Sequence, residues 1–215
     1  LNWEESGKNP YSDNAKAYYG KYLREHIKNL KVTSEPGKRF HYKSCDTQIL
    51  TYVLEQATGK TISDYMEEKI WSKIGPESNA LWSLDRKDGD EKGFCCFYAT
   101  SRDFAKIGQL ILNNGKWEGQ QLIPTKFLKN AIKPEKSILD KKGLENIRYG
   151  WHWWCASYNN APIHYARGLF GQYIIIYPKK NIVIVRTGKK RKKVQSDGHP
   201  SDLWEYLRMA ETVSK

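Results

Sequence analysis

The sequence has no apolar run long enough to cross a membrane. The longest candidate, from Tyr173 to Val185, is divided by the polar stretch Pro178 to Lys180 into two pieces of strand length, well short of the ~18 residues that a transmembrane helix needs. The first residues contain neither the charged nor the apolar segment of a leader peptide. We therefore expect no membrane span in this chain.

The residue spacings typical of metal sites are also missing. The four cysteines contain no Cys-x-x-Cys pair, and the five histidines contain no His-x-x-x-His pair. Neighbouring Cys95 and Cys96 are not expected to bridge each other, and nothing in the sequence pairs Cys45 with Cys155. All four cysteines are therefore predicted to be small core or strand residues, and no metal or other cofactor is expected.

No Pro-, Gly- or Ser-rich stretch long enough to link two domains interrupts the 215 residues, so we predict a single domain over residues 1–215. The net charge is +12, and much of the excess lies in the run Lys189 to Lys193. A single cluster of this kind favours a solvated loop, whereas nucleic-acid binding would need charge spread along a face with interleaved aromatic rings. We expect no nucleic-acid partner, and binding of DNA or RNA stays a minor alternative.

Apolar residues recur at helical spacing through the first two thirds of the chain, with capping residues before each run and glycine or proline after it. The predicted helices cover residues 15–30, 46–59, 61–75, 101–114 and 124–132. Runs of β-branched and aromatic residues then predict consecutive antiparallel strands at 149–155, 163–167, 172–177 and 182–187, before a last helix at 202–210. The pattern indicates an α+β fold, an antiparallel sheet flanked by helices.

Two short stretches combine polar side chains with positions that can face a cleft. The first, Phe40 to Ser44, brings Tyr42 to the start of the helix at 46–59. Taken alone, it also fits a helix start at which Ser44 or Asp46 is the cap and Tyr42 packs. The second, His164 to Gln172, has two glycines three residues apart between two strands, which fits either a tight turn or a close backbone approach to a ligand.

Together, the order and spacing of these stretches resemble the penicillin-binding and class C beta-lactamase-like serine hydrolases, including their esterase and amide-hydrolase branches. Phe40-x-Tyr42-x-Ser44 resembles the Tyr-x-Asn element of that family, and residues 47–75 resemble the helix pair that follows it. Residues 165–188 resemble the strand that forms one wall of the active site, together with the next two strands. Arg186-Thr187-Gly188 is similar to the Lys-Thr-Gly triad that the family carries on its wall strand. It ends a later strand, however, and is not assigned to the site.

The resemblance implies a role for each matching residue. Tyr42 would be the general base or proton relay, which requires nearby cations or hydrogen bonds to poise its phenol, and Ser44 would replace the usual Asn. Ile163-His164-Tyr165 stands where the family has Lys-Thr-Gly, so His164 or Arg167 would have to supply the missing cation. The N–H of Ala166 would help to bind the oxyanion. The substrate-binding residues would be His164, Tyr165, Arg167, Gly168, Gln172 and Trp153.

Trp151, Trp153 and Trp154 could line a pocket for apolar groups. Strand alternation also makes Trp153 a candidate core residue.

No serine has a lysine three residues later, and Gly-x-Ser-x-Gly is also missing. The resemblance places the nucleophile in a Ser-x-x-Lys segment upstream of Tyr42, so we expect a truncated chain that is inactive alone and that needs this N-terminal segment as a partner. It implies an acyl-enzyme hydrolase of amides or esters, acting on a small molecule or peptide and exported to the periplasm or cell envelope. The alternative is a non-catalytic ligand-binding module with the same fold.

Overall fold

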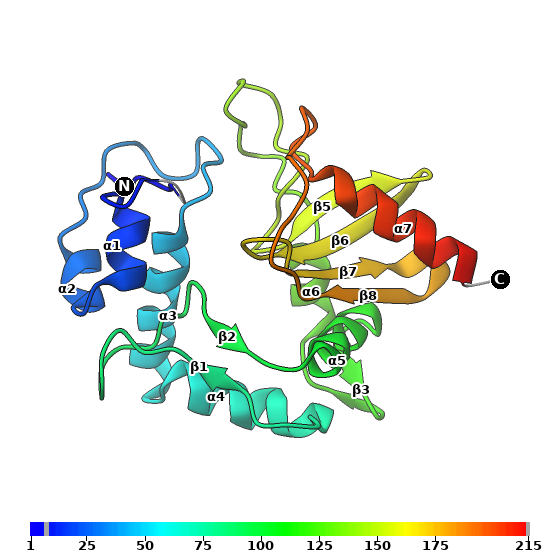
Figure 1. The fold of residues 1–215 in the computed structure, drawn as a ribbon, viewed down its shortest axis with the longest axis horizontal. Coiled ribbons are helices and arrows are strands. Elements are labelled where there is room, and N and C mark those ends of the chain that lie inside the picture. The colour runs from blue at the N-terminus through cyan, green and yellow to red at the C-terminus, as the bar shows by residue number, and fades with distance from the viewer. Residues whose placement is uncertain (7–8, 214–215) are drawn as a thin grey trace.

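The computed structural model describes residues 1–6 and 9–213 (Figure 1). Helices α1 (Asp13–Tyr19), α2 (Leu23–Lys28) and α3 (Ser44–Thr58) pack together at one side of the molecule. A four-stranded antiparallel sheet lies at the other side, and α4 (Ile62–Lys69) and α5 (Ser101–Leu112) lie along the part that joins them. This combination of helices and antiparallel sheets confirms the predicted α+β fold.

The predicted helix at residues 15–30 is in fact two helices, α1 and α2. Gly20 is extended, with φ −76° and ψ 166°, and its N–H closes the last turn of α1 on the carbonyl of Lys16. The first N–H of α2, that of Leu23, donates at 2.9 Å to a carboxylate oxygen of Asp85. A carboxylate from a distant loop therefore caps the second helix. The hydrophobic periodicity of the local sequence gives no sign of this cap.

The middle helices agree with the predictions. Thr61 and Thr100 cap α4 and α5 by accepting hydrogen bonds from the N–H groups of Asp64 and Asp103. A 3-10 turn, η1 (Trp71–Ile74), follows α4, and α6 (Thr125–Ala131) begins directly after Pro124. Two short antiparallel strand pairs were not predicted. In the first, β1 (Leu81–Trp82) pairs with β2 (Phe97–Tyr98), and in the second, β3 (Lys116–Trp117) pairs with β4 (Gln120–Gln121).

The sheet is a meander in the order β5 (Trp154–Tyr158), β6 (Ala161–Arg167), β7 (Tyr173–Tyr177) and β8 (Ile182–Arg186). Its first strand begins five residues later than the prediction of 149–155. Residues 150–153 instead form a tight turn in which the N–H of Gly150 donates to the carbonyl of Trp153 at 2.9 Å, and His152 adopts a positive φ of 64°.

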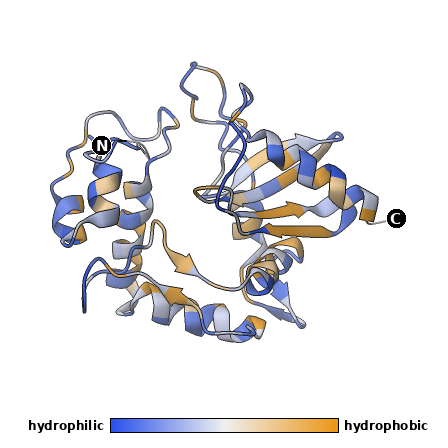
Figure 2. Cartoon of the chain, in the orientation of Figure 1, coloured by the Kyte–Doolittle hydropathy of each residue, from blue (hydrophilic) through white to orange (hydrophobic). Residues whose placement is uncertain are grey.

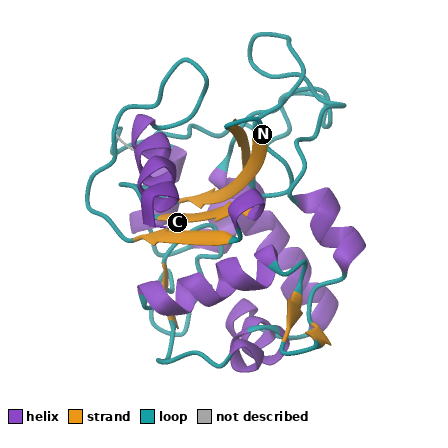
Figure 3. Ribbon diagram, turned by 90° about the vertical axis from the view of Figure 1, so that its right-hand side faces the viewer, coloured by secondary structure: helices purple, strands orange, loops and turns teal. Residues whose placement is uncertain are grey.

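Both faces of the sheet are covered by helices, which places the strands between helical layers (Figure 3). On one face, Leu203 and Leu207 of α7 (Ser201–Val213) pack on the odd-numbered side chains of β6 and β7, all of them buried: Ala161, Ile163, Tyr165, Tyr173, Ile175 and Tyr177. On the other face, a β-carbon at Gly108 of α5 would lie 2.4 Å from Val183, so only glycine permits this close approach. Figure 2 shows the resulting concentration of hydrophobic residues along the strands.

The cysteine prediction was partly wrong. Cys95 and Cys96 form a disulfide with each other, and Cys96 adopts the left-handed region at φ 66°. Cys45 and Cys155 are free and buried, with 0% and 4% of their surface exposed, which agrees with the expected core positions. The neighbouring pair can close because the backbone at Cys96 leaves the extended region that separates adjacent side chains.

None of the helices within residues 1–6 and 9–213 has the length and apolar character of a membrane span. In the same part of the chain, no three His, Cys, Asp or Glu side chains come together in a way that could hold a metal ion. The basic run at 189–193 is an exposed loop, as predicted.

Candidate active site

Tyr42 lies in a group of aromatic rings at the start of α3. Its ring contacts Tyr149 edge-on, with a centroid distance of 5.8 Å, and stacks on Trp154 at 6.0 Å. The extended segment before α3 is fixed by the N–H of Phe40, which donates to the carbonyl of Leu139 at 2.7 Å. Tyr42 is 39% exposed, so its ring packs on the group while part of it stays accessible.

Arg167, at the end of β6, joins this aromatic group. Its guanidinium lies 3.4 Å from the ring centroid of Trp154 and donates to the carbonyl of Gly198 at 3.1 Å. No ion pair between Arg167 and a carboxylate is found in the part of the chain that the structure describes. The structure thus brings together Tyr42 and Arg167, two of the predicted site residues, around Trp154.

The protonation of Tyr42 is set by opposing influences. Burial raises the pKa of its phenol above the usual value, and the negative charge of Glu5 raises this pKa further. Arg167 acts in the opposite direction, and its effect on the pKa is smaller than either. The phenol therefore stays protonated at neutral pH, and a role as general base requires a further cation next to it.

Ser44 is the first residue of α3, and Glu5 occupies its polar groups. The backbone N–H and the hydroxyl of Ser44 each donate to a different carboxylate oxygen of Glu5, both at 2.8 Å. The indole N–H of Trp3 donates to the same carboxylate at 2.7 Å. Ser44 is 8% exposed, so the structure places it in the packing of the helix N-terminus. Neither Ser44 nor Asp46 is the cap residue, because the helix begins after Lys43.

The side chain of His164 points away from the aromatic group, whereas the ring of Tyr165 stacks on Trp154 with a centroid distance of 6.3 Å. Tyr165 is fully buried against α7, and its hydroxyl lies 2.7 Å from Nδ1 of His199. His164 points to the opposite face of the sheet, where burial lowers its pKa to about 4, so its imidazole is neutral at pH 7. Of the two candidates for the missing cation, only Arg167 is both charged and placed beside Tyr42.

The backbone of β6 decides which N–H groups face the site. The N–H of Gly168 donates to Gln172 across the turn to β7 at 2.9 Å, and alternation then points the N–H of Ala166 to β7 as well, where Ala166 pairs with Ile174. The N–H groups of Tyr165 and Arg167 point to the other side, toward β5, which ends at the pair of Trp154 with Tyr165. The expected oxyanion role of Ala166 is thus corrected, because its N–H belongs to the sheet.

The side chains of Gln172 and Trp153, also predicted to bind substrate, make contacts that stabilise the fold. The side chain of Gln172 accepts a hydrogen bond from the N–H of Gly188 at 2.9 Å. Trp153 packs with Ile111, Leu128 and Ile176 between the sheet and α6, in agreement with the core alternative. A cavity of about 490 Å³ lies elsewhere, between α4 and the β1–β2 hairpin, and none of its lining residues belongs to the aromatic group.

Tyr149 and Glu5 were not identified from the sequence. Neither belongs to a motif, and each reaches Tyr42 or Ser44 only through the tertiary fold. Trp154 was named only as one of three tryptophans that could line a pocket.

The family model for beta-lactamase matches residues 4–203. The chain belongs to this beta-lactamase family. A curated relative, the 6-aminohexanoate-dimer hydrolase of Paenarthrobacter ureafaciens, is 22% identical to this family member over 154 residues, which cover 68% of this chain and 38% of the relative.

Two solved structures have a fold similar to that of this chain. A Bacillus anthracis protein assigned as a 6-aminohexanoate-dimer hydrolase superposes with a TM-score of 0.72 at 27% identity, covering all of this chain and 51% of that protein. A penicillin-binding protein homolog from Caulobacter crescentus, at 12% identity, shares the fold with a TM-score of 0.59, over 86% of this chain and 67% of its own. The chain thus spans about half the length, or less, of the two hydrolase relatives.

Proposed function

We propose that this chain supplies the tyrosine element and the wall strand of a serine hydrolase that cleaves amide or ester bonds through an acyl-enzyme. The observation that carries the proposal is the meeting of Tyr42 with Arg167 around Trp154, because it assembles a phenol and a cation from distant parts of the sequence. The names of the relatives support a hydrolase of this kind. In the acylation step, the serine oxygen attacks the carbonyl carbon while its proton passes to the general base.

The nucleophile would come from a Ser-x-x-Lys segment that is not in these 215 residues. The lysine of such a segment would provide the cation that Tyr42 needs, since the pKa of the phenol is raised when only Arg167 is nearby. A surface that could receive the segment is present on α3. Leu50 and Val53 lie on one face of this helix and are 52% and 57% exposed, opposite the face that carries buried Cys45 and Gln48.

The oxyanion would be held by the backbone that follows Ala166. The N–H of Arg167 points toward the side of β6 that β5 leaves open beyond Trp154. A backbone donor fixed in a strand can stabilise the developing negative charge without reorganisation. This proposal replaces the N–H of Ala166 with a neighbour of the opposite orientation.

The substrate would be a linear amide with a carboxylate at one end, such as a 6-aminohexanoate dimer. Arg167 is half-buried, has no carboxylate partner among the described residues, and lies beside Tyr42, so it is placed to bind an anionic group of the substrate. The raised pKa of Tyr42 supports the alternative of a non-catalytic ligand-binding module, in which the same cation would bind the ligand without turnover.

The proposal is tested by joining the chain at its N-terminus to a Ser-x-x-Lys segment and measuring hydrolysis of the linear 6-aminohexanoate dimer and of a nitrophenyl ester. In the joined protein, Tyr42→Phe should lower acylation by about 10²–10⁴-fold, because the proton relay is lost. Tyr149→Phe is the matched control, since its ring belongs to the same aromatic group.

An equal effect of the two substitutions would contradict the role of Tyr42. Binding of the dimer without turnover in the joined protein would favour the ligand-binding module.

A further inference from the structure

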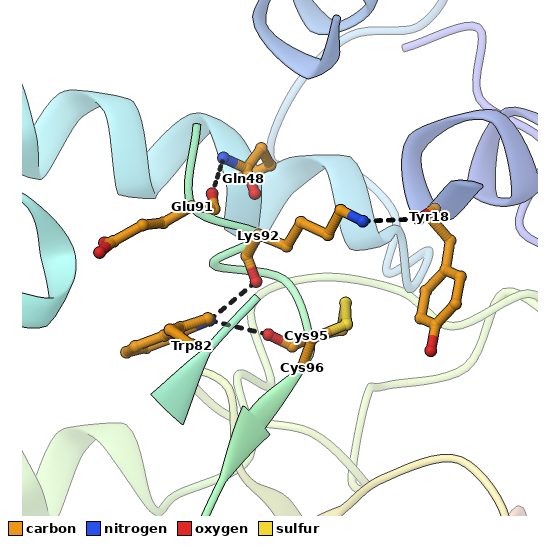
Figure 4. Close-up of a disulfide and its surroundings, with 7 residues drawn as sticks. All are labelled: Tyr18, Gln48, Trp82, Glu91, Lys92, Cys95 and Cys96. Carbon is orange, nitrogen blue, oxygen red and sulfur yellow. Dashed lines mark hydrogen bonds between the residues drawn. A yellow bond between two sulfur atoms is a disulfide. The ribbon is translucent and has the colours of Figure 1, made fainter. Parts of the chain in front are cut away.

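The disulfide between Cys95 and Cys96 lies at the end of the loop that connects β1 to β2 (Figure 4). The carbonyl of Cys95 accepts a hydrogen bond from the indole N–H of Trp82 at 2.8 Å, and the carbonyl of Cys96 accepts one from the N–H of Ser83 at 3.0 Å. Both carbonyls therefore bind the β1 side of the hairpin, and β2 begins at the next residue, Phe97.

The residues just before the disulfide are held against α3. The side-chain amide of Gln48 donates to the carbonyl of Glu91 at 3.0 Å, and a β-carbon at Gly93 would lie 1.9 Å from Oγ1 of Thr51. Phe94 packs on the cluster that α1, α2 and α3 form. The same segment also binds the β1 side of the hairpin, because the N–H of Lys92 donates to the carbonyl of Ser83 at 2.9 Å. The disulfide therefore joins a segment held by both α3 and β1 to the start of β2.

The residue after the disulfide packs into a different cluster. The ring of Phe97 contacts Trp71 at 5.3 Å and Trp82 at 4.9 Å. A change of backbone at Cys96 would consequently move the start of β2 relative to α3.

The backbone at Cys96 is in a conformation that a residue with a side chain rarely adopts. Its φ of 66° is in the left-handed region, which costs a residue other than glycine on the order of 1 kcal/mol or more. The covalent ring of the neighbouring pair limits the rotation of this backbone. When the ring opens, Cys96 is free to return to negative φ, and the hydrogen bond from Ser83 is then released.

The disulfide-bonded cysteines and the free cysteines differ in their exposure to solvent. Cys95 and Cys96 are partly exposed, whereas Cys45 and Cys155 are buried. Burial raises the pKa of both the Cys45 and the Cys155 thiol to about 12, so these two stay protonated and unreactive. Redox chemistry is therefore confined to the neighbouring pair.

We propose that Cys95–Cys96 is a reversible redox site whose partner is a dithiol reductant, and that its reduction loosens the β1–β2 hairpin where Ser83 binds Cys96. One thiolate of the reductant attacks a cysteine sulfur, and the other cysteine leaves as a thiolate, which takes up a proton. The second thiol of the reductant then resolves the mixed disulfide. The products are two cysteine thiols and the oxidised, disulfide form of the reductant. This inference does not depend on the proposed hydrolase activity.

The test starts from protein that has been oxidised with glutathione disulfide and is kept folded. Iodoacetamide should label no cysteine before treatment with dithiothreitol, and Cys95 and Cys96 but neither Cys45 nor Cys155 afterwards, as read by peptide mass spectrometry. Hydrogen exchange at the Ser83 amide should become about tenfold faster on reduction, while the Cys155 amide, bound to Arg148 at 2.8 Å, stays unchanged.

The double variant Cys95→Ser/Cys96→Ser should show the fast exchange at Ser83 with and without reductant. Labelling of Cys95 or Cys96 in the oxidised protein would overturn the redox site. Exchange at Ser83 that is equally slow in the reduced protein and in the double variant would overturn the coupling to the hairpin.

Discussion

The four-stranded sheet is packed on both faces, whereas helix α3 is packed on only one. The side chains of β6 and β7 are buried by α7 on one side and by α5 and α6 on the other. On α3, Cys45 and Gln48 are buried, but Leu50 and Val53 are more than half exposed. The sheet region therefore buries its own apolar surface, whereas the helical region leaves an apolar surface exposed, on which a further segment could pack.

Truncation of core leucines should give the largest difference between the two regions. Leu207→Ala should lower the free energy of unfolding by about 2–5 kcal/mol, because Leu207 is fully buried between α7 and the sheet. The matched change Leu50→Ala should alter it by less than about 0.5 kcal/mol in this chain. Urea unfolding of both variants measures the contrast, and a cost of several kcal/mol for Leu50→Ala would show that the α3 surface is already covered.

Acid should affect the sheet region through two buried histidines. Burial lowers the pKa of His164 and of His199 from 6.5 to about 4, so the unfolded chain takes up protons first as the pH falls. The free energy of unfolding should therefore be at its full value above about pH 6.5 with respect to these groups. It should fall between there and pH 4, by up to about 3 kcal/mol for each group.

The measurement is the urea midpoint as a function of pH, for the natural chain and for His164→Phe. The variant should lose less stability over this interval than the natural chain, and identical pH profiles would contradict the buried neutral state of His164.

Removal of single hydroxyl groups should give the smallest contrast. Tyr165→Phe should cost about 1–3 kcal/mol, because it leaves the buried Nδ1 of His199 without its partner. Tyr42→Phe should change stability by less than about 0.5 kcal/mol, since Tyr42 is partly exposed and contacts its neighbours through the ring. Thermal unfolding compares the two, and equal costs would mean that the Tyr42 hydroxyl is bound within the fold.

Much of the architecture could be predicted because it is locally encoded. The helices α4 and α5 carry their caps, Thr61 and Thr100, next to their apolar stripes, and Gly59 ends α3 in the left-handed region at φ 68°. The apolar stripe of α3 was detected, but periodicity does not say whether a partner covers it. The candidate site was predictable only in part, since the resemblance led to Tyr42, Tyr165 and Arg167, which meet around Trp154, but also to His164 and Ala166.

The sequence alone was enough to predict the α+β class, the order of the longer helices and of the sheet strands, and the position of Tyr42 before α3, since periodicity and caps act within a few residues of the chain. Only the tertiary structure decided which face of β6 each residue occupies, that Glu5 binds Ser44, and that Cys95 bridges Cys96. The physical reason is that strand pairing fixes the direction of every side chain and N–H group at once. A shift of one residue in that register exchanges the residues that face the site with those that face the core.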